Sequence, residues 1–178
     1  MEPADLKKGQ MQPEVLRKFS YGIYIVTSLN EEKINGQLAN TVFQITAEPP
    51  QIAISISKNN LTHEYIKKSG LFAVAVVADS APMTFIGHFG FRSGRVIDKF
   101  DNIKYKIGIT GCPLVIENCV AAIEAEVVGQ YDAGSHILFI GHVVGSELFN
   151  DKAAMSYDYY QKYLKAKTPK DSPTFNSK

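Results

Sequence analysis

Short runs of alternating apolar and polar residues recur along the chain and predict β-strands. In the most regular run, 51–57, three isoleucines alternate with small residues. Further strands are expected at 18–28, from 34 onward, and at 41–46, 71–77, 120–131 and 136–145. Polar turns separate several of these segments, as at 30–33 and 132–135, and two prolines end the segment that precedes residue 51.

Helical patterns interrupt the strands without alternating with them. Helices are expected at 61–69, where Asn60 supplies a candidate N-cap and Gly70 a C-terminal stop, at 80–90 and at 150–164. Because no βαβ rhythm or internal repeat occurs, the order predicts a mainly β protein built on an antiparallel barrel. One domain is expected over 14–165, with flexible ends at 1–13 and 166–178.

Composition excludes several classes of protein. Of 178 residues, 45% are hydrophobic, and 19 basic residues balance 18 acidic ones, so no net charge favours nucleic acid. Cys112 and Cys119 lack the spacing of a metal site and are predicted to be ordinary buried thiols. No run reaches the about 18–20 apolar residues of a membrane span. Without a recognisable secretory leader, a cytoplasmic protein is expected.

Familiar catalytic patterns are absent from the sequence. It contains no GxSxG, no GxGxxG between a strand and a helix, and no P-loop. His136 and His142 share one predicted strand face but lie roughly 20 Å apart, too far to bind one metal ion. Hydrolase chemistry, a Rossmann cofactor site and a histidine metal site are therefore disfavoured.

Two segments could bind a flat, anionic ligand. The polar, small-residue stretch 36–46 could match the hydrogen-bonding edge of a flavin ring, or could be an ordinary bulged strand. The helix start at 58–63 offers free backbone amides to an anion, or is simply a capped helix. Arg92 and Arg95 lie in a long connection, 91–111, either as phosphate ligands or as solvated charges.

The order of several motifs resembles the flavin reductase-like family of FMN-binding split barrels. Within that family the likeness is to ferric reductases, flavoredoxins and the flavin-reductase domain of high-molecular-weight rubredoxins. The matching pieces are SYGIYIVTS at 20–28, NGQLANTVFQIT at 35–46, EPPQIAISIS at 48–57, NLTHEYIKKSGLFAVAV at 60–76, FIGHFGFRSG at 85–94, GCPLV at 111–115 and GSHILFIGHVV at 134–144.

The resemblance implies a split β-barrel with inserted and C-terminal helices, a homodimer, and one FMN per subunit near the interface. It implies that Asn40 and Thr41 meet the ring edge and that His136 lies near flavin and nicotinamide, although Ser135 replaces the usual aspartate of that turn. The full implied cofactor site comprises Gln37, Ala39, Asn40, Thr41, Val42, Ser55, Ser57, Lys58, Asn59, Thr62, His63, Phe91, Arg92 and His136.

Three functions follow as hypotheses. The first is an oxidoreductase that passes electrons from NADH or NADPH through FMN to free flavin, ferric iron or a redox protein. The second is a flavoredoxin-type electron carrier that a protein partner reduces. The third is a cofactor-free barrel that binds nucleic acid or protein, which the balanced charge disfavours for nucleic acid.

Overall fold

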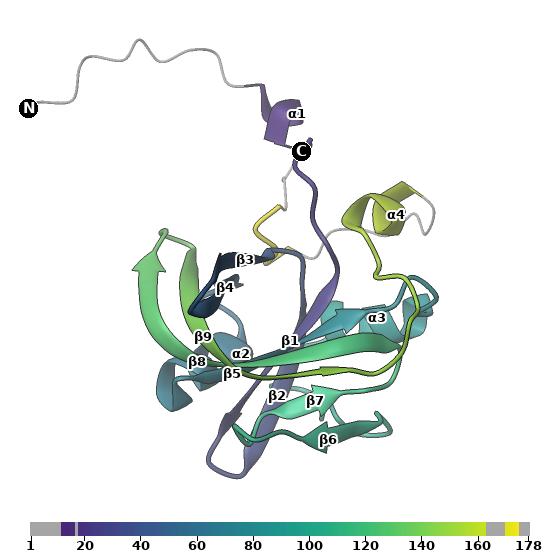
Figure 1. The fold of residues 1–178 in the computed structure, drawn as a ribbon. Helices are drawn as coiled ribbons and strands as arrows, with labels where there is room; N and C mark the ends of the chain where they lie inside the picture. Colours follow the sequence, from purple (N-terminus) through teal and green to yellow (C-terminus); the bar gives the residue numbers. More distant parts are fainter. Residues whose placement is uncertain (1–11, 17, 163–169, 175–178) are drawn as a thin grey trace, which may run out of the picture.

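The computed structural model describes residues 12–16, 18–162 and 170–174 (Figure 1). Strands outnumber helices, and the predicted mainly β, antiparallel split-barrel class is confirmed. In chain order the elements are α1 Pro13–Leu16, β1 Tyr24–Asn30, β2 Lys33–Ala39, β3 Val42–Ala47, β4 Pro50–Ser57, α2 Leu61–Ser69, β5 Leu71–Val77, α3 Met83–Gly90, β6 Tyr105–Ile107, β7 Pro113–Val115, β8 Cys119–Asp132, β9 His136–Leu148 and α4 Tyr157–Lys162.

Seven strands form one antiparallel sheet in the order β2-β1-β5-β8-β9-β4-β3, and β6 pairs with β7 in a separate ribbon. The sheet curves strongly, and its long β8–β9 hairpin rises at one side (Figure 1). β2 and β3 are the two edges of this sheet although only residues 40 and 41 separate them in the chain. The connection at 40–41 therefore crosses the open seam of the barrel.

Alternation along β4 explains its place in the barrel. Ile52, Ile54 and Ile56 are all buried, and β4 pairs with β9 from Gln51 opposite His142 to Ser57 opposite His136. The isoleucines join a core formed largely by β1, β4, β5, β9 and α2. Because side chains alternate between the faces of a strand, this register turns Ser55 and Ser57 to the other face.

A second core lies under α3 and α4. The aromatic side chains of Phe85, Phe89, Phe100 and Tyr160 pack there against Ile23, Ile25 and Val77.

Cys112 and Cys119 are buried free thiols, as the sequence predicts. Burial raises the pKa of the Cys112 thiol to about 11 and that of Cys119 to about 12, so both stay protonated at neutral pH. Among the described residues, no helix combines the length and apolar character needed to cross a bilayer.

Two predicted boundaries are wrong for the same reason. The first strand begins at Tyr24 rather than residue 18, and the last helix begins at Tyr157 rather than residue 150. The stretch 153–156 is extended because Met155 donates its amide to Val77 O at 2.8 Å and accepts from the amide of Ile23 at 3.0 Å. Tertiary pairing thus overrides the local pattern; positions 163 and 164 of the predicted helix lie outside the described residues.

The second predicted helix is also shorter than expected, since α3 begins at Met83 with Pro82, not Ser80, at the N-cap position.

Glu124 in β8 is buried, although the sequence around it gives no sign of a hydrogen-bond donor for its carboxylate. Its carboxylate accepts hydrogen bonds from the amide and hydroxyl of Thr110, at 2.8 and 2.7 Å. These bonds attach the β6–β7 ribbon to the main sheet.

Gly141 provides a test of the packing between β9 and β5. A Cβ at this position would lie 2.5 Å from Phe72 Cζ and 2.8 Å from Ala125 Cβ. We expect Gly141→Ala to lower the free energy of unfolding by about 1–3 kcal/mol, the usual cost of overpacking a core. Urea denaturation of Gly129→Ala is the control, because a Cβ there meets Ile140 at 3.8 Å, an ordinary contact. Equal midpoints for the two variants would contradict this packing.

Candidate functional site

The seam between the two sheet edges carries a buried polar residue. Asn40 is only 4% exposed and follows directly after β2. Its Oδ1 accepts a hydrogen bond from Thr41 Oγ1 at 3.1 Å, and Thr41 O accepts from the amide of Ser55 at 3.1 Å. The crossing at 40–41 is thereby fixed to β4.

A cavity of about 390 Å³ opens beside this crossing, which we call the main cavity. Its volume lies in the range of about 300–1,000 Å³ typical of small-molecule sites. Segments from β2, β4, the start of α2, the end of α3 and the loop after it, α4 and residues 170–173 meet around it. The lining comprises Ile23, Asn35–Asn40, Ser55, Asn59–Thr62, Phe89–Gly94, Lys99, Tyr157, Tyr160 and Lys170–Pro173.

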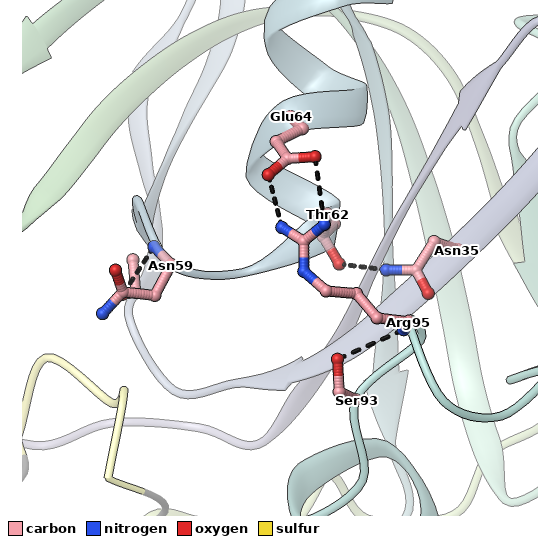
Figure 2. A network of polar contacts seen from close by, with 7 residues as sticks. Asn35, Asn59, Thr62, Glu64, Ser93 and Arg95 are labelled. Atoms are coloured by element: carbon pink, nitrogen blue, oxygen red, sulfur yellow. Dashed lines mark hydrogen bonds and ion pairs between the residues drawn. The ribbon is translucent and has the colours of Figure 1, made fainter.

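One end of the main cavity is the first turn of α2. The amides of a helix's first turn lack intrahelical acceptors and favour anions. Asn60 occupies the N-cap position without a side-chain cap bond, and its backbone carbonyl accepts the amide of His63 at 3.1 Å. Thr62 holds this helix start against β2, because its hydroxyl accepts a 2.8 Å hydrogen bond from buried Asn35 (Figure 2).

The loop after α3 closes the same end. Figure 2 shows Arg95 reaching back to Glu64 on α2, with two hydrogen bonds between the guanidinium and the carboxylate. This contact lowers the pKa of the Glu64 carboxyl. Gly94 packs so closely on β2 that a Cβ there would lie 1.9 Å from Asn35 Oδ1. Arg95 is therefore engaged with Glu64, and Arg92 is the loop arginine that lines the cavity.

Lys99 is a buried ammonium in the cavity wall, with 2% of its surface exposed. Its Nζ donates to the carbonyl oxygens of His88, at 2.6 Å, and Phe89, at 3.2 Å, at the end of α3. His88 Nε2 in turn lies 2.9 Å from Lys99 O, so this nitrogen carries the proton. Burial, and secondarily the charge of Arg92, lowers the pKa of Lys99 to about 8.

A second cavity, also of about 390 Å³, lies next to the first and is called the side cavity. Ser55, Ser57, Asn59, Ala133, Ser135, His136 and Lys170–Pro173 line it. His136 Nε2 lies 3.2 Å from Asp171 O, and its Nδ1 lies 2.8 Å from Ser135 Oγ. Because a carbonyl only accepts, we assign a proton to Nε2, which donates to Asp171 O.

The structure brings ten of the fourteen sequence-predicted site residues to this cleft. Eight line the main cavity, and Ser57 and His136 line the side cavity; the eight are Gln37, Ala39, Asn40, Ser55, Asn59, Thr62, Phe91 and Arg92. Among them, Gln37 has a buried Oε1 with no hydrogen-bond partner in the described structure. A buried acceptor without a donor is costly in free energy.

The other four predicted residues line neither cavity. Thr41 supports Asn40, and Val42 packs against the core next to β4. Lys58 is paired with Asp132, Nζ to Oδ2 at 2.7 Å. His63 is buried beside Phe139, with ring centroids 5.8 Å apart, and burial lowers its pKa. The period of α2 directs residue 63 inward, so His63 lies outside both cavities, and its role as a phosphate ligand stays a prediction.

Comparison with known proteins decides the family. A family model described as "Flavin reductase like domain" matches residues 16–166. The chain belongs to the flavin reductase-like family. The order of the motifs in the sequence predicts the same family, and that prediction is confirmed.

Relatives of this flavin reductase-like protein cover nearly its whole length. It is 46% identical over 165 residues to the "Ferric-chelate reductase (NAD(P)H)" of Archaeoglobus fulgidus, covering 93% of this chain and 98% of that one. It is 44% identical over 165 residues to the "High molecular weight rubredoxin" of Moorella thermoacetica, covering 93% and 72%. The solved FMN-binding protein of Thermus thermophilus is 26% identical, with a TM-score of 0.71, covering 82% and 80%.

Several cavity residues of the flavin reductase-like chain escaped sequence reasoning. Lys99 stood among other basic residues of the long connection, and nothing in its neighbours distinguished it. Tyr157, Tyr160 and residues 170–173 come from the C-terminal part of the chain, for which the sequence predicts a helix at 150–164 and a flexible end at 166–178. Only the tyrosine spacing on that helix gave a signal, since residues three apart share a face.

Lys99 should make stability depend on pH in the alkaline range. Its pKa of about 8 in the folded chain is below the ordinary lysine value of about 10.4, so the unfolded state binds more protons between these values. Protonating the buried Lys99 amine in the folded chain costs free energy, so the protein becomes less stable as the pH falls toward 8. We expect the free energy of unfolding of wild type minus that of Lys99→Met to rise by about 2 kcal/mol from about pH 7.5 to about pH 9.5.

Urea denaturation at several pH values measures this difference. Lys104→Met, which removes an exposed lysine from the same connection, is the control. Its difference from wild type should stay flat over the same range. A flat difference for Lys99→Met as well would show that the ammonium is not held in a desolvated site.

Proposed function

We propose that this chain binds FMN in the main cavity and uses it to carry electrons from NADH or NADPH to an acceptor, either free flavin, ferric iron or a redox protein. The observation that carries the proposal is the cavity itself. One end offers helix amides and Arg92 to an anion, and the wall offers the partnerless Gln37 Oε1. The NAD(P)H-dependent ferric-chelate reductase and the FMN-binding protein to which the chain is similar support it.

The residues present fit FMN. The start of α2 and Arg92 would hold the phosphate, where a dianion meets both the helix dipole and a guanidinium. Gln37 and Asn40 would face the polar edge of the ring, since both supply amide groups from β2 and the seam. Gly36, Ala39 and Ser55 have small side chains, which would let a flat ring approach the backbone of that wall.

Bound FMN would supply the redox chemistry, and the chain would supply binding and orientation. No side chain need act as a nucleophile. His136 lies in the adjoining side cavity, with its Nε2 proton directed at the carbonyl of Asp171. It would lie beside a second ligand, such as the nicotinamide donor, next to the flavin.

Anaerobic titration tests the function. Purified chain is loaded with FMN, freed of excess ligand, and titrated separately with NADH and NADPH while the visible flavin band is followed. We expect stoichiometric FMN and bleaching by at least one nucleotide. Bound FMN that neither nucleotide bleaches would favour the second candidate, a flavoredoxin-type carrier, which the likeness to a rubredoxin-containing protein also supports. Chain that stays colourless would contradict both candidates.

Two substitutions test the site itself. We expect Asn40→Ala to weaken FMN binding about tenfold by removing a buried amide, and Arg92→Ala to weaken it about tenfold by removing a charge-assisted contact. Lys152→Ala makes the same charge change outside both cavities and should bind as wild type does. Fluorescence titration measures the three dissociation constants. Unchanged affinity in both site variants would show that the flavin binds elsewhere.

We propose further that the chain forms a homodimer through the edge strand β3. Phe43 and Ile45 on this strand are 51% and 42% exposed, although both are large and apolar. A second copy would cover this edge and place the interface next to the seam that holds Asn40.

Sedimentation velocity tests the dimer. We expect Phe43→Glu to shift a dimer to monomer, because a carboxylate would be buried in the contact. Val96→Glu is the matched control, since Val96 is 83% exposed on the loop after α3. A monomeric wild type, or a Phe43→Glu variant that stays dimeric, would contradict this interface.

A further inference from the structure

Residues 170–174 lie across the cleft, and we call this segment the strap. Three side chains of the cleft donate hydrogen bonds to it. Asp171 Oδ1 accepts from Asn59 Nδ2 at 3.2 Å, Asp171 O accepts from His136 Nε2 at 3.2 Å, and Thr174 Oγ1 accepts from Asn40 Nδ2 at 2.7 Å. Thr174 also donates to Tyr157 at 3.2 Å. The sequence had assigned 166–178 to a flexible tail.

The strap divides one cleft into two. Lys170–Pro173 line the main cavity and the side cavity alike, as do Ser55 and Asn59. The strap forms a wall of each cavity, so the two cavities are parts of one groove that the strap divides. Without the strap, the groove would run from Arg92 at one end to His136 at the other.

The attachment points of the strap lie on three separate parts of the barrel. Asn40 lies at the seam after β2, Asn59 just before α2, and His136 at the start of β9. All three are residues that line the cleft, and each uses its side chain for the strap. The strap therefore spans the cleft from rim to rim, and does not lie along one rim.

The open space beneath the strap shows whether the strap covers the ligand site or occupies it. A segment that competed with the ligand would fill the cavity, yet about 390 Å³ stays open under the strap. The buried Oε1 of Gln37, in the same cavity, has no partner from the strap or from any other described residue. The strap thus closes over a space that still has an unmet hydrogen-bonding group.

We propose that the strap is a binding element of this protein, which covers the ligand in the main cavity and slows its escape. The inference rests on the proposed function, with FMN as the ligand. Three hydrogen bonds from cleft side chains hold the strap, and two of them come from side chains that are not buried, Asn59 and His136, so the strap can open to admit the ligand. Once closed, it separates the main cavity from solvent on the side of Asp171 and Ser172.

Two shortened chains test the proposal. One ends at Pro169 and lacks the strap; its matched control ends at Thr174 and keeps it. We expect the chain ending at 169 to bind FMN at least tenfold more weakly than the full chain, mainly through faster dissociation, and iodide to quench its bound flavin more strongly. The chain ending at 174 should behave as the full chain does.

A double substitution tests the attachment without shortening the chain. Asp171→Ala with Thr174→Val removes two of the three acceptors and should weaken FMN binding about three- to tenfold. Hydrogen exchange of the strap amides in the full chain should slow when FMN is added. Thermal melting of each FMN-free variant checks that the barrel is intact.

The outcomes separate the two proposals. Full chain that fails to bind FMN overturns the proposed function. Full chain that binds FMN, with equal affinity and quenching in the chain ending at 169, overturns the strap as a binding element. Tighter binding after removal of the strap would show that it competes with the ligand, which also overturns the proposal.

Discussion

The open seam of the barrel is the constraint on which the rest of the structure depends. β2 and β3 are neighbours in the chain but opposite edges of the sheet, so the backbone must cross from one edge to the other within residues 40 and 41. Backbone polar groups in such a crossing cannot join a sheet ladder and need other partners. Asn40, Thr41 and Ser55 satisfy one another there, and the space beside them becomes the main cavity.

Polar ties between distant segments give that cavity its shape. Asn35 is bonded to Thr62, Arg95 to Glu64, and Lys99 to the last carbonyls of α3. Each joins two segments that approach only in the fold, and together they hold the start of α2 and the loop after α3 at one end. The buried ammonium of Lys99 is costly to desolvate, and its hydrogen bonds to two carbonyls offset part of that cost.

The same architecture explains why a redox protein of this kind needs no catalytic triad. The groove of this chain has a helix start and Arg92 at one end, Gln37 and Asn40 in its wall, and His136 on the other side of residues 170–173. A cofactor bound in such a groove can carry the redox chemistry, so the protein has to supply only the shape, the charge and the accessibility of the binding site. In this chain, residues 170–173 lie far along the sequence from β2 and β4 and line the same groove.

The sequence by itself determined the β-rich class, the isoleucine face of β4, the family, and ten of the residues that line the cleft. Those features depend on local periodicity and on the order of motifs, which are properties of the linear chain. The structure alone decided that His63 faces Phe139, that Glu124 is buried, that α4 starts only at Tyr157, and that residues 170–174 lie over the cavity. Each of these is set by a partner many residues away, and no local pattern records which distant segment will supply it.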